Sequence, residues 1–167
     1  MQGFRQHRAT KTMRYKNITV QSEDFDISEA LRPMRLADSG IGAIASFVGI
    51  VRDLNDNRDV SIMELEHYPG MTEHAIETIV DEAASRWRLT GAVVIHRVGR
   101  LAPTDQIVLV STASTHRGDA FESCEFIMDF LKTRAPFWKK ESTPQGDRWV
   151  ASRDSDSAAA KRWEKSD

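Results

Sequence analysis

The feature that most constrains the fold is a helical periodicity between residues 72 and 87, flanked on each side by a pair of strand-like segments. Apolar residues recur there at intervals of three and four, which places them on one face of an α-helix. Thr72 can cap the amino end of this helix. Because the strand-like segments come in pairs rather than alternating singly with helices, the pattern favours an α+β domain over regular βαβ winding. The periodic positions are Ala75, Ile76, Ile79, Val80, Ala83, Ala84 and Trp87.

The four segments around this helix have the composition of strands. Residues 41–51 form a dense apolar run, and residues 61–68 alternate between apolar and polar side chains. Residues 92–98 and 106–113 are apolar enough to lie inside a sheet. We therefore expect these four segments to be strands.

A second helix is expected from about Gly118 to Thr133, where three phenylalanines indicate burial on most sides. It must end before Pro136, because the proline ring and the missing N–H are incompatible with a helix interior. Residues 137–142 and 147–151 then flank a turn-forming TPQG and predict a β-hairpin.

The two ends of the chain complete the expected organisation. Residues 158–163 predict a short closing helix. Residues 1–16 contain several basic residues and no acidic one, and we interpret them as a flexible tail. Residues 17–167 are then expected to form one domain.

Composition narrows the possible functions. With 23 Lys+Arg against 25 Asp+Glu, the formal charge of -2 argues against a protein that coats nucleic acid or an anionic membrane. A single cysteine, Cys124, excludes an internal disulfide and a multi-thiolate zinc site. No histidine pair has metal-binding helical spacing, and no apolar run approaches the ~20 residues of a membrane span. We expect a cytoplasmic protein without a bound metal or cofactor.

Basic residues recur where the expected strands and helices end. Such positions suit an anion site, because Arg offers a planar fork to oxyanions and Lys a mobile charge. His116 and Arg117 would lie at a helix amino end, where unpaired N–H groups also attract anions. Taken singly, each Lys or Arg is more simply explained as a solvated surface charge, and a helix end without a ligand explains His116 and Arg117 as well as an anion site does. Only the grouping of these residues favours a site. The basic positions are Arg52, His116, Arg117, Lys132, Arg134, Lys139 and Lys140.

Cys124 lies on the apolar face of the second helix, between Ala120 and Ile127. A nucleophilic cysteine needs an electropositive and partly exposed setting. We therefore predict that Cys124 is a core residue, and that any sulfur handled by the protein comes from elsewhere.

Three stretches carry a family resemblance. LEHYPGMTEHAIETIVDEAASRW (65–87), VIHRVGRLAPTD (94–105) and FIMDFLKTRAPFWKKESTPQGDRWV (126–150) closely resemble the large, catalytic subunit of molybdopterin synthase. The resemblance spans about residues 40 to 163. It implies an α+β fold of the α/β hammerhead type, a mixed sheet with two main helices and an added β-hairpin subdomain.

The resemblance also implies an activity and partners. Members of this family transfer two sulfurs to cyclic pyranopterin monophosphate, which forms the dithiolene of molybdopterin. The sulfurs arrive as a thiocarboxylate on the C-terminal Gly-Gly of a small ubiquitin-like carrier subunit. Two large subunits form a homodimer at the centre of a heterotetramer. Neither nucleic acid nor membrane is an expected partner.

The resemblance assigns site residues by motif. Lys132 in FLKTRAPFW and Lys139 in FWKKE match catalytic lysines, and THR supplies His116 and Arg117. The family often has Lys where this chain has Ile50, which leaves one fewer cation for the phosphate. The expected substrate-binding set is Phe47, Ile50, Val51, Arg52, His116, Arg117, Lys132, Lys139, Lys140, Glu141 and Arg153.

The residue types fit that chemistry independently of the resemblance. Transfer from a thiocarboxylate leaves an acyl-linked intermediate that water must cleave, and a buried amine beside other cations has the lowered pKa that proton transfer needs. Lys132 is the candidate for this role. Two other classes remain open on the residues alone: a module that binds a phosphorylated ligand without chemistry, and a phosphoesterase. Phosphate ester cleavage usually relies on a bound ion, and the sequence offers no ligands for one.

Overall fold

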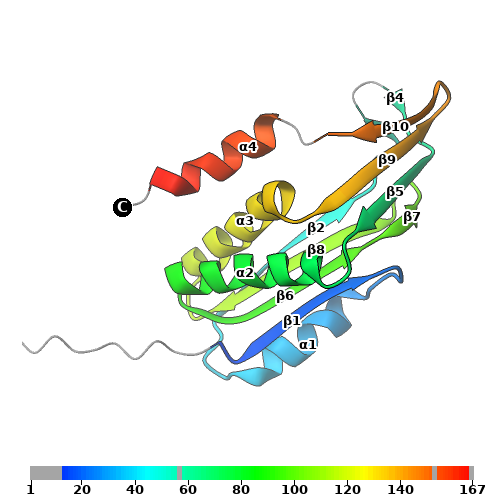
Figure 1. The fold of residues 1–167 in the computed structure, drawn as a ribbon. Helices are drawn as coiled ribbons and strands as arrows, with labels where there is room; N and C mark the ends of the chain where they lie inside the picture. The colour runs from blue at the N-terminus through cyan, green and yellow to red at the C-terminus, as the bar shows by residue number, and fades with distance from the viewer. Residues whose placement is uncertain (1–12, 56–57, 152–153, 166–167) are drawn as a thin grey trace, which may run out of the picture.

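The computed structural model describes residues 13–55, 58–151 and 154–165, and arranges their strands mainly in two four-stranded sheets (Figure 1). In the first sheet β1 runs parallel to β6, whereas the β6–β8 and β8–β2 pairs are antiparallel, so the sheet is mixed. Its strands, in spatial order, are β1 (Tyr15–Gln21), β6 (Leu89–Arg97), β8 (Gln106–Ser114) and β2 (Ala43–Ile50).

Helices cover both faces of this first sheet (Figure 1). Val93 and Ile95 of β6 pack in the cluster that includes Met34 of α1, whereas Ala92 and Val94 pack with α2 and α3. Burial on both faces explains why β6 and β8 are nearly continuous apolar runs. The helices are α1 (Ile27–Ala37), α2 (Met71–Arg86), α3 (Arg117–Arg134) and α4 (Asp154–Lys161), the last packed on α3 and followed by the 3-10 turn η1 (Arg162–Lys165).

The second sheet is antiparallel and includes the hairpin that follows α3. Pro136 stops α3, and the extended backbone of Ala135 leads the chain directly into β9. The sharp turn keeps the last turn of α3 close to the first residues of β9. The strands of this sheet, in spatial order, are β10 (Gly146–Val150), β9 (Phe137–Thr143), β5 (Ile62–His67) and β7 (Gly99–Leu101). Two further short strands, β3 (Leu54–Asn55) and β4 (Arg58–Asp59), pair with each other.

The expected α+β class, the four strands, both main helices and the hairpin are confirmed. β1, α1 and the short strands β3, β4 and β7 were not expected, and β1 contains Tyr15 and Lys16, which fall within the expected tail. Lys16 Nζ lies 2.8 Å from Glu77 Oε1 and 3.0 Å from Asp81 Oδ1, so it ties β1 to α2. Residues 1–12 of the expected tail lie outside the described residues.

The cap of α2 also differs from the expectation. Gly70, with a φ of 84°, is the N-cap, and its N–H donates to Glu73 Oε2 at 2.7 Å. Thr72 instead lies inside the first turn, where its buried hydroxyl accepts from Tyr68 N–H and donates to the carbonyl of Pro136. Thr72 therefore fastens α2 to the segment that joins α3 to β9.

The contact between β6 and α1 generates a stability prediction. A Cβ on Gly91 would lie 2.6 Å from Cγ of the fully buried Met34, whereas a Cβ on Gly118 meets nothing within 4 Å. We expect Gly91→Ala to lower the free energy of unfolding by about 1–3 kcal/mol through overpacking. Gly118→Ala, the matched control in a helix, is expected to be neutral or stabilising. Urea denaturation measures both, and equal stability of the two variants would contradict this account of the β6–α1 contact.

Candidate active site

A cleft of about 460 Å³ lies where the carboxyl end of α3 meets β2 and the second sheet. One part of its lining is apolar and the other carries charge, an arrangement typical of small-molecule sites. The main apolar residues are Phe47, Val48, Ile50, Met128, Leu131 and Phe137. The charged or polar residues are Arg52, His96, Lys132, Lys139, Glu141 and Asp156.

The cleft gathers six of the expected site residues from three separate chain segments. The segment that begins with β2 contributes Phe47, Ile50 and Arg52, α3 contributes Lys132, and β9 contributes Lys139 and Glu141. Three cationic side chains therefore face one space, although nearly ninety residues of sequence separate the first from the last.

Glu141 holds one of these cations in place. Its side chain is fully buried, with Oε1 3.0 Å from Lys139 Nζ and Oε2 2.9 Å from a terminal nitrogen of Arg148. A buried carboxylate is tolerated when it is paired and hydrogen-bonded in this way, and removing one partner is costly. The geometry makes Glu141 a positioning group for Lys139.

Strand alternation removes Lys140 from the cleft. Lys139 and Glu141 face the cleft, so Lys140 points to the opposite face of β9, as the period of two requires. Its Nζ lies 3.7 Å from carboxylate oxygens of Glu64 and of Asp147. Lys140 therefore does not line the cleft of the single chain, and its expected contact with the substrate stays a prediction.

Two further expected residues are not seen in the cleft. Val51 is buried in the cluster of Met63, Leu65 and Leu101 and does not line the cleft of the single chain, so its expected contact with the substrate stays a prediction. Its side chain turns inward because the strand ends there and the chain bends into the following loop. Arg153 lies outside the described residues.

His116 and Arg117 lie at the other end of α3. They are exposed and line a separate, shallow hollow of about 430 Å³. Arg117 and Lys132 are fifteen positions apart on one helix, which separates them by roughly 22 Å at 1.5 Å per residue. Within one chain, therefore, the THR motif and the lysines do not share a cleft.

Lys132 is exposed at the cleft rather than buried. The expectation of a desolvated amine is therefore not met by the single chain. Any further desolvation of this amine has to come from a molecule that covers the cleft.

Sequence reasoning considered His96 for metal binding alone and missed its place in the cleft. Its ring stacks on Phe137 at a centroid distance of 3.8 Å and an interplanar angle of 18°. Burial lowers the pKa of His96 to about 4, and the positive charge of Lys132 adds to the effect. One feature of the sequence could have indicated His96. It lies two residues after Val94 on the same face of a buried strand, where a polar side chain is unusual.

Cys124 is a core residue, as expected. It is 6% exposed, its Sγ lies 3.5 Å from the carbonyl of Val110, and burial raises its pKa to about 11. Within the described residues, no three His, Cys, Asp or Glu side chains gather into a group able to hold a metal ion. No described helix combines the length and the apolarity needed to cross a membrane.

The cleft combines three cations with an apolar wall, an arrangement that suits a small anionic molecule with an apolar part. The sequence matches the family model described as "MoaE protein" over residues 20–134. The chain belongs to this family. It is an enzyme of molybdenum cofactor biosynthesis, since its curated relatives are named as catalytic subunits.

Individual relatives agree with this assignment. The molybdopterin synthase catalytic subunit of Ralstonia nicotianae is 60% identical over 146 residues, which cover 87% of this chain and 83% of the relative. The solved MoaE protein of Burkholderia ambifaria is 55% identical with a TM-score of 0.78, and the match covers 90% of this chain and 99% of that one.

A more distant solved structure has the same fold. It is described as a protein-protein complex of subunits 1 and 2 of the molybdopterin-converting factor from Helicobacter pylori. The match is 22% identical with a TM-score of 0.64, and it covers 83% of this chain and 91% of that one.

The burial of Cys124 predicts that its thiol is dispensable for catalysis. Cys124→Ala should cost about 1–2 kcal/mol of stability through a small cavity and leave turnover per folded molecule unchanged. The native protein should also react slowly with iodoacetamide at pH 7.5, because a pKa of about 11 leaves almost no thiolate. A folded Cys124→Ala protein without activity would show that the chain itself carries sulfur.

Proposed function

We propose that this enzyme is a sulfurtransferase that converts cyclic pyranopterin monophosphate to molybdopterin. The two dithiolene sulfurs come from the thiocarboxylate at the C-terminal Gly-Gly of a small carrier subunit. The observation that carries this proposal is the convergence of Arg52, Lys132 and Lys139 on one half-apolar cleft, in a chain whose relatives are named as catalytic subunits. Because the reaction belongs to a cytoplasmic pathway in this family, we expect the enzyme in the cytoplasm.

Each cleft residue has a role that its chemistry permits. The carrier's thiocarboxylate sulfur attacks an electrophilic substrate carbon, and the electron pair of the bond that is displaced at this carbon is taken up by the departing oxygen, which is protonated. Water then cleaves the acyl–sulfur bond, which leaves the sulfur on the substrate and a carboxylate on the carrier. Lys132 transfers protons in these steps. Lys139, held by Glu141, stabilises the oxyanion that forms when water attacks the acyl carbon. Arg52 binds the anionic part of the substrate through its planar fork.

The carrier tail would complete the desolvation of Lys132. A Gly-Gly terminus has the narrow backbone needed to enter between the loop of Arg52 and the segment from Lys132 to Lys139. Covering the cleft excludes water and strengthens every charge interaction inside it. The description of the relatives as catalytic subunits of molybdopterin synthase supports the presence of a partner subunit.

His116 and Arg117 would act from a second copy of the chain. At roughly 22 Å along α3 they are too far away to reach the cleft of their own chain. In a two-fold homodimer, the THR motif of one protomer can instead face the lysines of the other. With one carrier bound to each protomer, the assembly is a heterotetramer.

Reconstitution tests the proposed function. The purified chain is mixed with a thiocarboxylated carrier and cyclic pyranopterin monophosphate, and dithiolene product is measured. Product that depends on all three components is expected. Tight binding of both ligands without product would favour a binding module, and release of inorganic phosphate would favour a phosphoesterase.

Lys132→Ala should reduce turnover by about 100-fold or more, because a positioned proton carrier is lost. The fold should survive, since the side chain is exposed. Lys132→Arg should fail as well, because a guanidinium does not give up its proton near neutral pH. Single-turnover product formation measures both variants, and rates within a few fold of the parent would remove Lys132 from the mechanism.

Lys139 and Lys140 form a matched pair, because they are neighbours in β9 on opposite faces. Lys139→Gln should weaken binding of the carrier by about tenfold, or ~1.4 kcal/mol, because the carboxylate of the carrier's C-terminal tail is desolvated in the cleft and loses the cation beside it. Lys140→Gln should change it less than about twofold, as is usual for an exposed ion pair. Calorimetric titration measures both, and equal effects would show that the carrier responds to general charge and does not thread into the cleft.

A further inference from the structure

His96 differs in charge and in hydrogen bonding from the cations around it. Among the described residues that line the cleft, it is the one imidazole. In their charged forms Arg52, Lys132 and Lys139 only donate hydrogen bonds. Both carboxylate oxygens of Glu141 are already engaged by Lys139 and Arg148, and the remaining carboxylate of the lining, Asp156, is an acceptor that carries a negative charge.

The hydrogen bonds of the ring fix its tautomer. His96 Nδ1 lies 2.8 Å from the carbonyl oxygen of Arg97, and a carbonyl can only accept, so Nδ1 carries the proton and donates. In the neutral ring Nε2 is then an acceptor. No hydrogen bond to Nε2 is present within the described part of the chain. The lowered pKa of His96, about 4, keeps the ring neutral at physiological pH.

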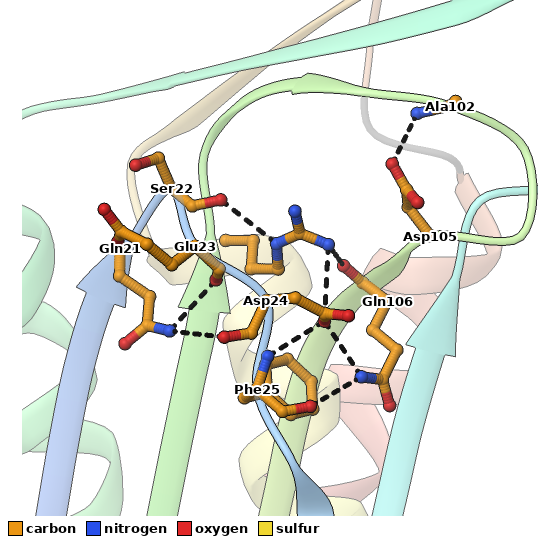
Figure 2. A network of polar contacts seen from close by, with 9 residues as sticks. Gln21, Ser22, Glu23, Asp24, Phe25, Ala102, Asp105 and Gln106 are labelled. Atoms are coloured by element: carbon orange, nitrogen blue, oxygen red, sulfur yellow. Dashed lines mark hydrogen bonds and ion pairs between the residues drawn. The ribbon is translucent and has the colours of Figure 1, made fainter.

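The ring is also held rigidly. Phe137 stacks on one face, and the backbone that receives the Nδ1 proton belongs to a fixed residue. The Arg97 guanidinium donates to the carbonyls of Ser22 at 3.2 Å and Gln106 at 3.0 Å, and lies 3.4 Å from Asp24 Oδ1. Figure 2 shows Asp24 and Gln106 joined in the same network, which ties the end of β6 to the start of β8 and to the segment after β1. The acceptor atom is thus oriented before any ligand arrives.

We propose that His96 is a substrate-recognition residue whose Nε2 accepts a hydrogen bond from an N–H or O–H group of the pterin ring system. The cations bind the phosphate, and His96 selects for a donor on the ring part of the same molecule. A neutral acceptor suits this task because a carboxylate at the same place would repel an anionic substrate. The inference rests on the proposed function for the identity of the substrate.

Two ligands and two variants test the proposal by calorimetric titration. The ligands are cyclic pyranopterin monophosphate and sulfate, a dianion without any hydrogen-bond donor. His96→Phe keeps an aromatic ring for Phe137 and removes the acceptor, whereas His96→Gln keeps an acceptor near the position of Nε2. His96→Phe should bind the pterin about tenfold more weakly and sulfate with unchanged affinity, and His96→Gln should stay within about threefold of the parent for both.

Each other outcome counts against the proposal. Equal pterin affinity of His96→Phe and the parent would show that Nε2 does not touch the substrate. Parallel loss of pterin and sulfate binding would show a structural role, and His96→Gln behaving like His96→Phe would exclude recognition through an acceptor. A parent protein that binds sulfate and no pterin would overturn the proposed function together with this inference, whereas the preceding outcomes leave the proposed function standing.

Discussion

The packing of α3 across the first sheet is the constraint on which the rest of the site depends. Its buried residues Phe126, Ile127, Phe130 and Leu131 lie in the main core, so neither the rotation nor the axial position of the helix can change without opening cavities. This packing sets Lys132 at the cleft and His116 at the opposite end. The two ends of α3 therefore line two separate hollows on the surface of the chain.

Charge in the cleft is arranged by backbone geometry more than by composition. The alternation of β9 sends Lys139 and Lys140 to opposite faces, although they are neighbours in sequence. Glu141, two residues after Lys139, lies on the same face and forms ion pairs with Lys139 and Arg148. Burial in turn keeps His96 neutral among cations. The cleft thus presents fixed donors and one oriented neutral acceptor.

The helices and strands with strong periodicity were predictable from the sequence, because burial on one or two faces leaves a direct pattern in the chain. The segment of α1 was missed, since Pro33 lies inside it and three charged residues interrupt its apolar positions. β1 was missed because its parallel pairing with β6 joins residues more than seventy positions apart. Motifs located the cations of the cleft, but the faces of Lys140 and Val51 depended on strand register and on where β2 ends.

The place of His96 in the cleft could not be predicted from the sequence. His96 gains its properties from Phe137 and from the network around Arg97, which bring together segments far apart in sequence. Its polar character on a buried strand was visible, but nothing local distinguished a ligand-facing ring from a satisfied core histidine.

The central claim is that one active site needs residues from two copies of the chain, and subunit mixing tests it most directly. A protein carrying His116→Ala with Arg117→Ala and a protein carrying Lys132→Ala are each prepared, shown to be folded, and allowed to exchange subunits. Every mixed dimer then has one site with all its residues, so random mixing should restore about a quarter of the parent's activity. No recovered activity, when mass spectrometry shows that mixed dimers have formed, would contradict a shared site.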